Sequence, residues 1–306
     1  MSDILHSVGA VHSFLQSIKQ GDTRILSRCI SWVENESGNY LEILQSLDLD
    51  QFSKNIIGIT GPPGAGKSTL IDALTGELLG KGGKKIAIIC IDPSSPFHAG
   101  ALLGDRIRMS KWFTHPDVYI RSLASRGNAG GLNPKVIEIT DLLKGARFDY
   151  ILIETVGVGQ NEVEVASIAD STVVVLTPES GDDIQTMKSG LMEIADIFVV
   201  NKSDHPEADN LFRHLENAVM HSKREIPIVK TIASQGVGIE TLSQIIFSDL
   251  SLNKNIEKRY RLLAEKTYQL VLQKKMRSID KQALLGKIRE GVRKENFNIY
   301  RFIESL

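Results

Sequence analysis

Cysteine is scarce in this chain of 306 residues, because only Cys29 and Cys90 occur and they are far apart in sequence. Cys90 lies inside the apolar run of residues 86–91, and both side chains are best interpreted as buried, reduced thiols. This pattern argues against a disulfide framework and indicates a reducing compartment. A chain of this length buries a core large enough to fold without a disulfide or metal.

Long hydrophobic stretches are also lacking. No segment reaches the roughly 20 apolar residues that a membrane-spanning helix needs. Residues 1–6 have neither the basic start and apolar core of a secretion signal nor the Arg-rich amphipathic character of a transit peptide. The expected location is therefore the cytoplasm, with no membrane partner.

A strong net charge is missing as well. The chain has 36 Lys+Arg against 37 Asp+Glu, which gives a formal charge of −1 and no overall electrostatic case for a nucleic-acid partner. The charge is nevertheless uneven. Residues 253–306 contain 14 basic and 6 acidic side chains, so this tail carries +8 and the rest carries −9.

The basic tail also lacks proline, since all nine prolines lie between residues 62 and 227. Its apolar positions between residues 256 and 270 step by about one helical turn, which predicts one long amphipathic helix. A second helix is predicted over residues 281–303. Two interpretations of the basic charge stay open, a solvated helix face and a partner-binding surface.

The rest of the chain divides into two predicted parts. Residues 1–50 show helical periodicity and are interpreted as an N-terminal helical extension. Residues 51–252 alternate short apolar runs with helical segments, which predicts a doubly wound α/β domain with a mostly parallel sheet. The strand candidates are residues 56–59, 86–91, 118–120, 150–154, 172–177, 197–200 and 226–232.

Residues 61–68 read GPPGAGKS and stand between the first predicted strand and a helical pattern over residues 70–79. This is the G-x-x-x-x-G-K-[ST] phosphate-binding loop (P-loop), in which backbone N–H groups surround phosphate oxygens at a helix N-terminus. Lys67 is expected to reach the β and γ phosphates, and the Ser68 hydroxyl to bind Mg²⁺. The candidate phosphate-binding residues are Gly61, Pro62, Pro63, Gly64, Ala65, Gly66, Lys67, Ser68 and Thr69.

The base is predicted from Asn201, Lys202, Ser203 and Asp204, which directly follow a late strand. An aspartate there can accept hydrogen bonds from N1–H and the amino group of guanine, whereas the unprotonated N1 of adenine would repel it. The N-K-x-D pattern therefore favours GTP over ATP, with a simple surface turn as the alternative. Residues Ala233, Ser234 and Gln235 are expected to offer backbone N–H groups to guanine O6.

A second strand motif predicts the metal side of the site. Glu154 ends the strand candidate 150–154, where its carboxylate would reach Mg²⁺, and the Gly157 N–H could sense the γ phosphate. The alternative is that Glu154 is a carboxylate at the end of a strand and binds no metal. Ras-type GTPases have a water-orienting glutamine after that glycine, but this chain has Val158, so hydrolysis is expected to be slow unless Gln160 or a neighbour substitutes.

Asp92 and Asp105 are two further acidic candidates. Asp92 follows the second predicted strand and Asp105 follows a loop, so both could approach Mg²⁺ and form a nucleotide-sensing switch. Alternatively, Asp105 simply caps a helix over residues 106–113. The candidate catalytic residues are Lys67, Asp92, Asp105 and Glu154, and the candidate metal ligands are Ser68, Asp92, Asp105 and Glu154.

The ordered motifs GPPGAGKSTL, IDPSSPF, GDRIRM, ASRG, ETVGVGQ, ESGDDIQTMKSG and NKSD resemble the MeaB/ArgK family of P-loop GTPases over about residues 50–250. The resemblance implies a chaperone of adenosylcobalamin-dependent methylmalonyl-CoA mutase, with GTP/GDP and Mg²⁺ as cofactors. It places Asp92, Asp105 and Glu154 in the Mg²⁺ and switch network. It also implies that residues 181–188 signal to the mutase and that the C-terminal helices form a homodimer. One departure is Ile232, where the family usually has serine.

Other functions remain alternatives. A metal-insertion GTPase of the hydrogenase or urease type needs Cys or His clusters, whereas the seven histidines here are scattered and no C-x-x-C occurs. A P-loop ATPase or kinase of an amino-acid transport system would need an adenine pocket, against which the NKSD motif argues.

Overall fold

The computed structural model describes residues 8–49, 55–92, 109–124, 133–155, 161–179, 190–222, 224–252, 256–276, 279–293 and 297–304. The chain forms two compact units, residues 1–255 and residues 256–306.

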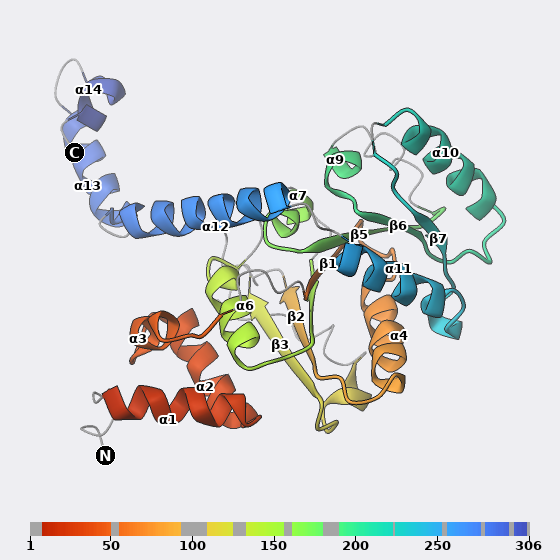
Figure 1. Cartoon of the computed structure of the whole chain (residues 1–306). Helices are drawn as coiled ribbons and strands as arrows, with labels where there is room; N and C mark the ends of the chain where they lie inside the picture. The colour runs from red at the N-terminus through yellow and green to blue at the C-terminus, as the bar shows by residue number, and fades with distance from the viewer. Residues whose placement is uncertain are drawn as a thin grey trace. The chain divides into compact units, whose positions relative to one another are not determined.

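A seven-stranded sheet is the centre of the first unit (Figure 1). Its order is β3-β2-β4-β1-β5-β6-β7, and every neighbouring pair is parallel. The predicted doubly wound α/β fold is therefore confirmed. The strands are β1 (Ile56–Thr60), β2 (Ile86–Asp92), β3 (Val118–Ala124), β4 (Tyr150–Glu154), β5 (Ser171–Leu176), β6 (Ile197–Val200) and β7 (Ile228–Lys230).

Alternate residues of the strands enter two separate cores, as the period of two in a β-strand requires. Val173 and Val175 of β5 pack with α4 (Lys67–Gly80) and α11 (Ile239–Leu252). Val174 and Leu176 face the opposite core with α9 (Met192–Ile194) and α10 (Ala208–Met220). Because helices cover both faces, the strands are continuous apolar runs. Four other helical segments follow β1 in the described part of this unit. They are α6 (Val136–Gly145), α7 (Asn161–Ala166), and the 3₁₀ turns η2 (Ser110–Trp112) and η4 (Ala233–Gln235).

The N-terminal helices belong to the same unit and pack on α6 and on the edge strand β3. They are α1 (Val8–Lys19), α2 (Thr23–Glu34) and α3 (Tyr40–Gln45). Asp22 caps α2 by accepting hydrogen bonds from the Arg24 and Ile25 N–H groups. Ser27 contacts the Tyr119 hydroxyl at 3.0 Å, and Glu34 pairs with Arg121. Because Tyr119 and Arg121 are two residues apart, α2 contacts side chains on one face of β3.

The second unit contains α12 (Ile256–Met276), α13 (Lys281–Val292) and α14 (Ile299–Glu304). The long first helix of the tail is confirmed, but the prediction of one helix over residues 281–303 is wrong. A new helix begins because the Asn298 side chain accepts hydrogen bonds from the N–H groups of Tyr300 and Arg301, as an N-cap does.

Candidate nucleotide-binding site

The P-loop follows the central strand β1, at the carboxyl end of the sheet where ligands of doubly wound folds bind. Two of its glycines are required by geometry. Gly61 has φ +138°, and a Cβ there would lie 2.0 Å from the Val175 carbonyl oxygen. Gly66 has φ +86°, and a Cβ there would lie 2.4 Å from Asn201 Nδ2. Larger residues are therefore excluded from both positions, and α4 can begin directly after the loop.

Lys67 folds back across the loop that contains it. Its side chain is buried, and Nζ donates hydrogen bonds to the carbonyl oxygens of Gly61 at 2.8 Å and Pro62 at 2.9 Å. The ammonium is therefore held inside the cradle where the sequence motif predicts phosphate.

Ser68 and Glu154 meet on the other side of the loop. Strand pairing aligns Glu154 with Ile59 near the end of β1, and Ser68 lies in the first turn of α4. The Ser68 hydroxyl donates to Glu154 Oε1 at 2.6 Å, and both side chains are buried. A hydroxyl and a carboxylate so close together form a hard oxygen donor pair, which fits Mg²⁺.

Asn201 links the P-loop to the segment after β7. Its Nδ2 donates to the Ala65 carbonyl at 2.9 Å. Its Oδ1 accepts hydrogen bonds from Thr231 Oγ1 at 3.0 Å and from the Ala233 N–H at 3.1 Å. Because Asn201 is only 3% exposed, one side chain fixes the phosphate loop and the predicted base loop relative to each other.

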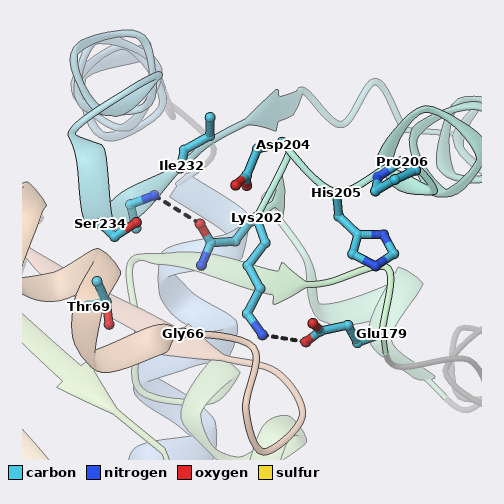
Figure 2. A pocket seen from close by; sticks show the side chains of 11 residues that line it. Gly66, Thr69, Glu179, Lys202, Asp204, His205, Pro206, Ile232 and Ser234 are labelled. Atoms are coloured by element: carbon cyan, nitrogen blue, oxygen red, sulfur yellow. Dashed lines mark hydrogen bonds and ion pairs between the residues drawn. The ribbon is translucent and has the colours of Figure 1, made fainter.

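A cavity of about 480 Å³ lies beside this link and is shown in Figure 2. Its volume is in the usual range for small-molecule sites. The lining residues are Gly66, Thr69, Glu179, Asn201, Lys202, Asp204, His205, Pro206, Ile232, Ala233 and Ser234. Within the described part of the chain, the Asp204 carboxylate takes part in no hydrogen bond or ion pair. The cavity therefore presents an acceptor of the kind that the NKSD motif predicts for guanine.

The backbone amides of the predicted base loop are partly occupied. The Ala233 N–H donates to Asn201, and the Gln235 N–H donates to the Ile232 carbonyl at 2.9 Å. Among these three residues, only the Ser234 N–H has no hydrogen bond within the described structure. Ile232 also lines the cavity, so an apolar side chain stands where a serine hydroxyl was expected from the resemblance.

Lys202 and Glu179 form an ion pair at the cavity (Figure 2). The hydrogen bond and charge of Lys202 hold the pKa of Glu179 below its ordinary value. Sequence reasoning did not identify Glu179, His205 or Pro206 as lining residues. The position of Glu179 depends on the pairing of β5 with β6, which no local motif indicates. His205 and Pro206 directly follow the NKSD motif, and that adjacency was the signal that could have identified them.

Several residues that the sequence predicts for the site lie outside the part of the chain that the structure describes. Asp92 is the last residue of β2, but its side chain is outside the described residues. Asp105, Gly157, Val158 and the segment 181–188 are also outside them. Within the described ranges, no three or more His, Cys, Asp or Glu side chains gather into a metal-binding group. The helices in those ranges include none that is long and apolar enough to cross a membrane.

Comparison with protein families gives one match to most of the chain. A family model described as methylmalonyl-CoA mutase-associated GTPase MeaB matches residues 26–284. A Pyrococcus abyssi protein named as a GTPase is 40% identical over 294 residues, covering 94% of this chain and 89% of that protein. The Escherichia coli GTPase ArgK is 37% identical over 216 residues, covering 69% of this chain and 65% of ArgK.

A mitochondrial methylmalonic aciduria type A homolog from Caenorhabditis elegans is 36% identical over 208 residues, covering 63% of this chain and 52% of that protein. Two solved structures share the fold. The LAO/AO transport system kinase has a TM-score of 0.63 at 24% identity, covering 95% of this chain and 89% of its own. HypB from Helicobacter pylori, solved with nickel, has a TM-score of 0.52 at 16% identity, covering 70% of this chain and 94% of HypB. At these identities the two structures support the fold alone.

Proposed function

Since this chain belongs to the family of methylmalonyl-CoA mutase-associated GTPases, we propose that it is a GTP-hydrolysing chaperone of a cobalamin-dependent acyl-CoA mutase. In this proposal it gates the loading, protection or reactivation of adenosylcobalamin in methylmalonyl-CoA mutase or a related enzyme. GTP or GDP and Mg²⁺ occupy the site described above.

The family match supports the mutase part of the proposal, and the observation that carries the nucleotide part is the Asn201 link. It joins the loop that contains Lys67 and Ser68 to a cavity that contains Asp204. The same buried side chain therefore joins the proposed phosphate loop to the loop that borders the proposed guanine cavity. Only a ligand with both a phosphate chain and a base would use both parts of this arrangement.

Hydrolysis is the attack of water on the γ phosphorus, with cleavage of its bond to the β–γ bridging oxygen, and it yields GDP, inorganic phosphate and the proton lost by the water. Lys67 leaves the Gly61 and Pro62 carbonyls and stabilises charge on the β and γ phosphates. Ser68 and Glu154 would hold Mg²⁺, which neutralises phosphate charge when bound. We assign Asp92 and Asp105 to the same network on the resemblance alone.

The proposed hydrolysis is slow in the isolated protein, because Val158 stands where Ras-type enzymes have a water-orienting glutamine. A partner that orders the segments around the γ phosphate would raise the rate. In this proposal residues 181–188 carry the signal to the mutase, with Lys188 as the residue to test.

Homodimerisation is assigned to residues 253–306. Apolar side chains on α12 remain exposed within the described unit, among them Tyr260, Tyr268 and Met276, which are at least half exposed. A second copy of the chain would cover such a surface. Light scattering should therefore find a dimer, and a monomer at micromolar concentration would refute the assignment.

The deciding experiment combines co-purification with steady-state GTPase measurements, with and without methylmalonyl-CoA mutase. A non-hydrolysable GTP analogue should change the amount of mutase that is retained, and the mutase should raise the GTPase rate. Lys188→Ala should keep GTP affinity and lose stimulation, whereas Lys67→Ala should lose turnover with an unchanged circular dichroism spectrum. Absence of both binding and stimulation with every cobalamin-dependent mutase tested would refute the chaperone role.

A further inference from the structure

The cavity beside Asn201 contains few charged or titratable side chains. They are Glu179, Lys202, Asp204 and His205. Lys202 is the only lysine or arginine among the lining residues that the structure describes, and it has two carboxylates within the same cavity. Which carboxylate it pairs with determines the charge that an incoming base meets.

In this structure Lys202 pairs with Glu179. Figure 2 shows the lysine side chain extending toward Glu179, while the Asp204 carboxylate lies on the side of the cavity near Ile232. Glu179 follows β5, whereas Lys202 and Asp204 follow β6. The ion pair therefore joins two neighbouring strand ends across the cavity.

The backbone of Lys202 is fixed, so its side chain is the part that can change partners. Lys202 has φ +53°, which is a strained conformation for a lysine. Its carbonyl accepts a hydrogen bond from the His205 N–H at 3.0 Å, and the next N–H, of Ser203, donates to the Thr231 carbonyl at 3.0 Å. Only the flexible side chain remains to select between Glu179 and Asp204.

Asp204 is within reach of the same ammonium. Two residues apart in a chain are separated by at most about 7 Å, which the four methylene groups of a lysine can span. If the Lys202 ammonium paired with Asp204, guanine would have to displace it before its N1–H and amino group could bind the carboxylate. That competition would weaken every nucleotide that depends on Asp204.

His205 does not replace Lys202 in this competition. Its Nδ1 accepts a hydrogen bond from the Glu207 N–H at 3.2 Å, which holds the ring toward the start of α10. Figure 2 shows the ring on the Glu179 side of the cavity. The charge balance next to Asp204 is therefore set by Lys202.

We propose that Glu179 is a positioning residue for base recognition, because it holds the Lys202 ammonium away from Asp204 and so keeps the Asp204 carboxylate available to guanine. The inference rests on the proposed nucleotide site and adds to it a residue whose effect passes entirely through Lys202.

The test measures GDP binding to the full-length chain by displacement of a fluorescent GDP analogue. Glu179→Gln removes the charge and keeps the shape of the side chain. Because the pair is exposed, we expect GDP affinity to fall only about two- to fivefold. With Lys202→Met as the background, the added Glu179→Gln should have no further effect, since no ammonium remains to move.

A second background separates this role from simple support of the cavity wall. Asp204→Asn exchanges the carboxylate for an amide and is expected to bind xanthosine diphosphate. In this background Glu179→Gln should leave the affinity for xanthosine diphosphate unchanged, whereas a merely structural role would lower it. If Asp204→Asn binds no xanthine nucleotide, the Lys202→Met comparison decides alone.

The chain offers a matched control in Asp209 and Lys230, another exposed pair with an oxygen to nitrogen distance of 2.6 Å. The hydrogen bond and charge of Lys230 likewise lower the pKa of Asp209, but neither residue lines the cavity. Asp209→Asn should leave GDP affinity unchanged.

Two results would overturn the inference: unchanged GDP affinity in Glu179→Gln, or a fall that persists in the Lys202→Met background. Failure of the wild-type chain to bind GDP is a different outcome, because it would overturn the proposed nucleotide site and this inference with it.

Discussion

Replacing Asn201 by alanine should separate the phosphate loop from the base loop. The change removes three hydrogen bonds, to the Ala65 carbonyl, from Thr231 Oγ1 and from the Ala233 N–H. Each such bond contributes about 1 kcal/mol net. Since Asn201 is 3% exposed, little water compensates, and the free energy of unfolding should fall by about 3 kcal/mol.

Urea unfolding of the nucleotide-free protein measures this loss through tryptophan fluorescence. The two tryptophans, Trp32 and Trp112, both lie in residues 1–255, so the signal reports the unit that contains the site. Thr231→Val is the control for a single hydrogen bond. It removes only one of the three bonds, so the free energy of unfolding should fall by about 1 kcal/mol.

GDP binding gives the second readout, since loops that are not held in place must be ordered when the ligand binds, and this lowers the affinity. We expect Asn201→Ala to weaken GDP binding by more than tenfold, whereas Thr231→Val should have a smaller effect. An unfolding free energy within about 0.5 kcal/mol of wild type, together with unchanged GDP affinity, would refute the view of Asn201 as the link.

Four other predictions concern individual residues. Gly66→Ala should impair nucleotide binding measured by calorimetry, because its Cβ would lie 2.4 Å from Asn201 Nδ2 at φ +86°. Asp204→Asn should weaken GTP binding by about 2–4 kcal/mol and shift preference toward xanthine nucleotides in a competition assay, and equal binding of ATP and GTP by wild type would contradict the guanine assignment. Burial raises the pKa of Cys29 from 9.0 to about 11, so its contribution to stability should decline only above about pH 9, where the unfolded thiol ionises first. Cys29 and Cys90 should both resist a thiol reagent at pH 8 until urea unfolds the chain.

The sequence was sufficient for the main sheet because buried parallel strands are continuous apolar runs. Prediction from the sequence was less accurate for the ends of the two edge strands, β3 and β7. The prediction ended β3 at residue 120, but the strand continues to Ala124 because its backbone stays paired with β2 as far as Asp92. The prediction for β7 covered residues 226–232, whereas the strand is Ile228–Lys230. Pro227 has no N–H for a ladder, although its carbonyl accepts from Phe198.

In the candidate site, the parts formed by local motifs were also predicted, whereas contacts between distant residues were not. The P-loop and the NKSD motif are local patterns, and the structure places Gly66, Asn201 and Asp204 around one cavity. The Glu179–Lys202 pair and the contact between Asn201 and Ala65 join residues 23 and 136 positions apart. Such partners are set by the order of the strands, which no local periodicity encodes.

The resting position of Lys67 has a consequence for every affinity that will be measured at this site. If Lys67 binds nucleotide as proposed, binding is an exchange in which phosphate oxygens replace the Gly61 and Pro62 carbonyls as acceptors of the same ammonium. The observed affinity is therefore smaller than the lysine–phosphate attraction alone would give. Removing the Lys67 side chain also removes these two hydrogen bonds from the P-loop of the nucleotide-free protein. The stability of Lys67 variants without nucleotide must therefore be measured before their binding constants are compared.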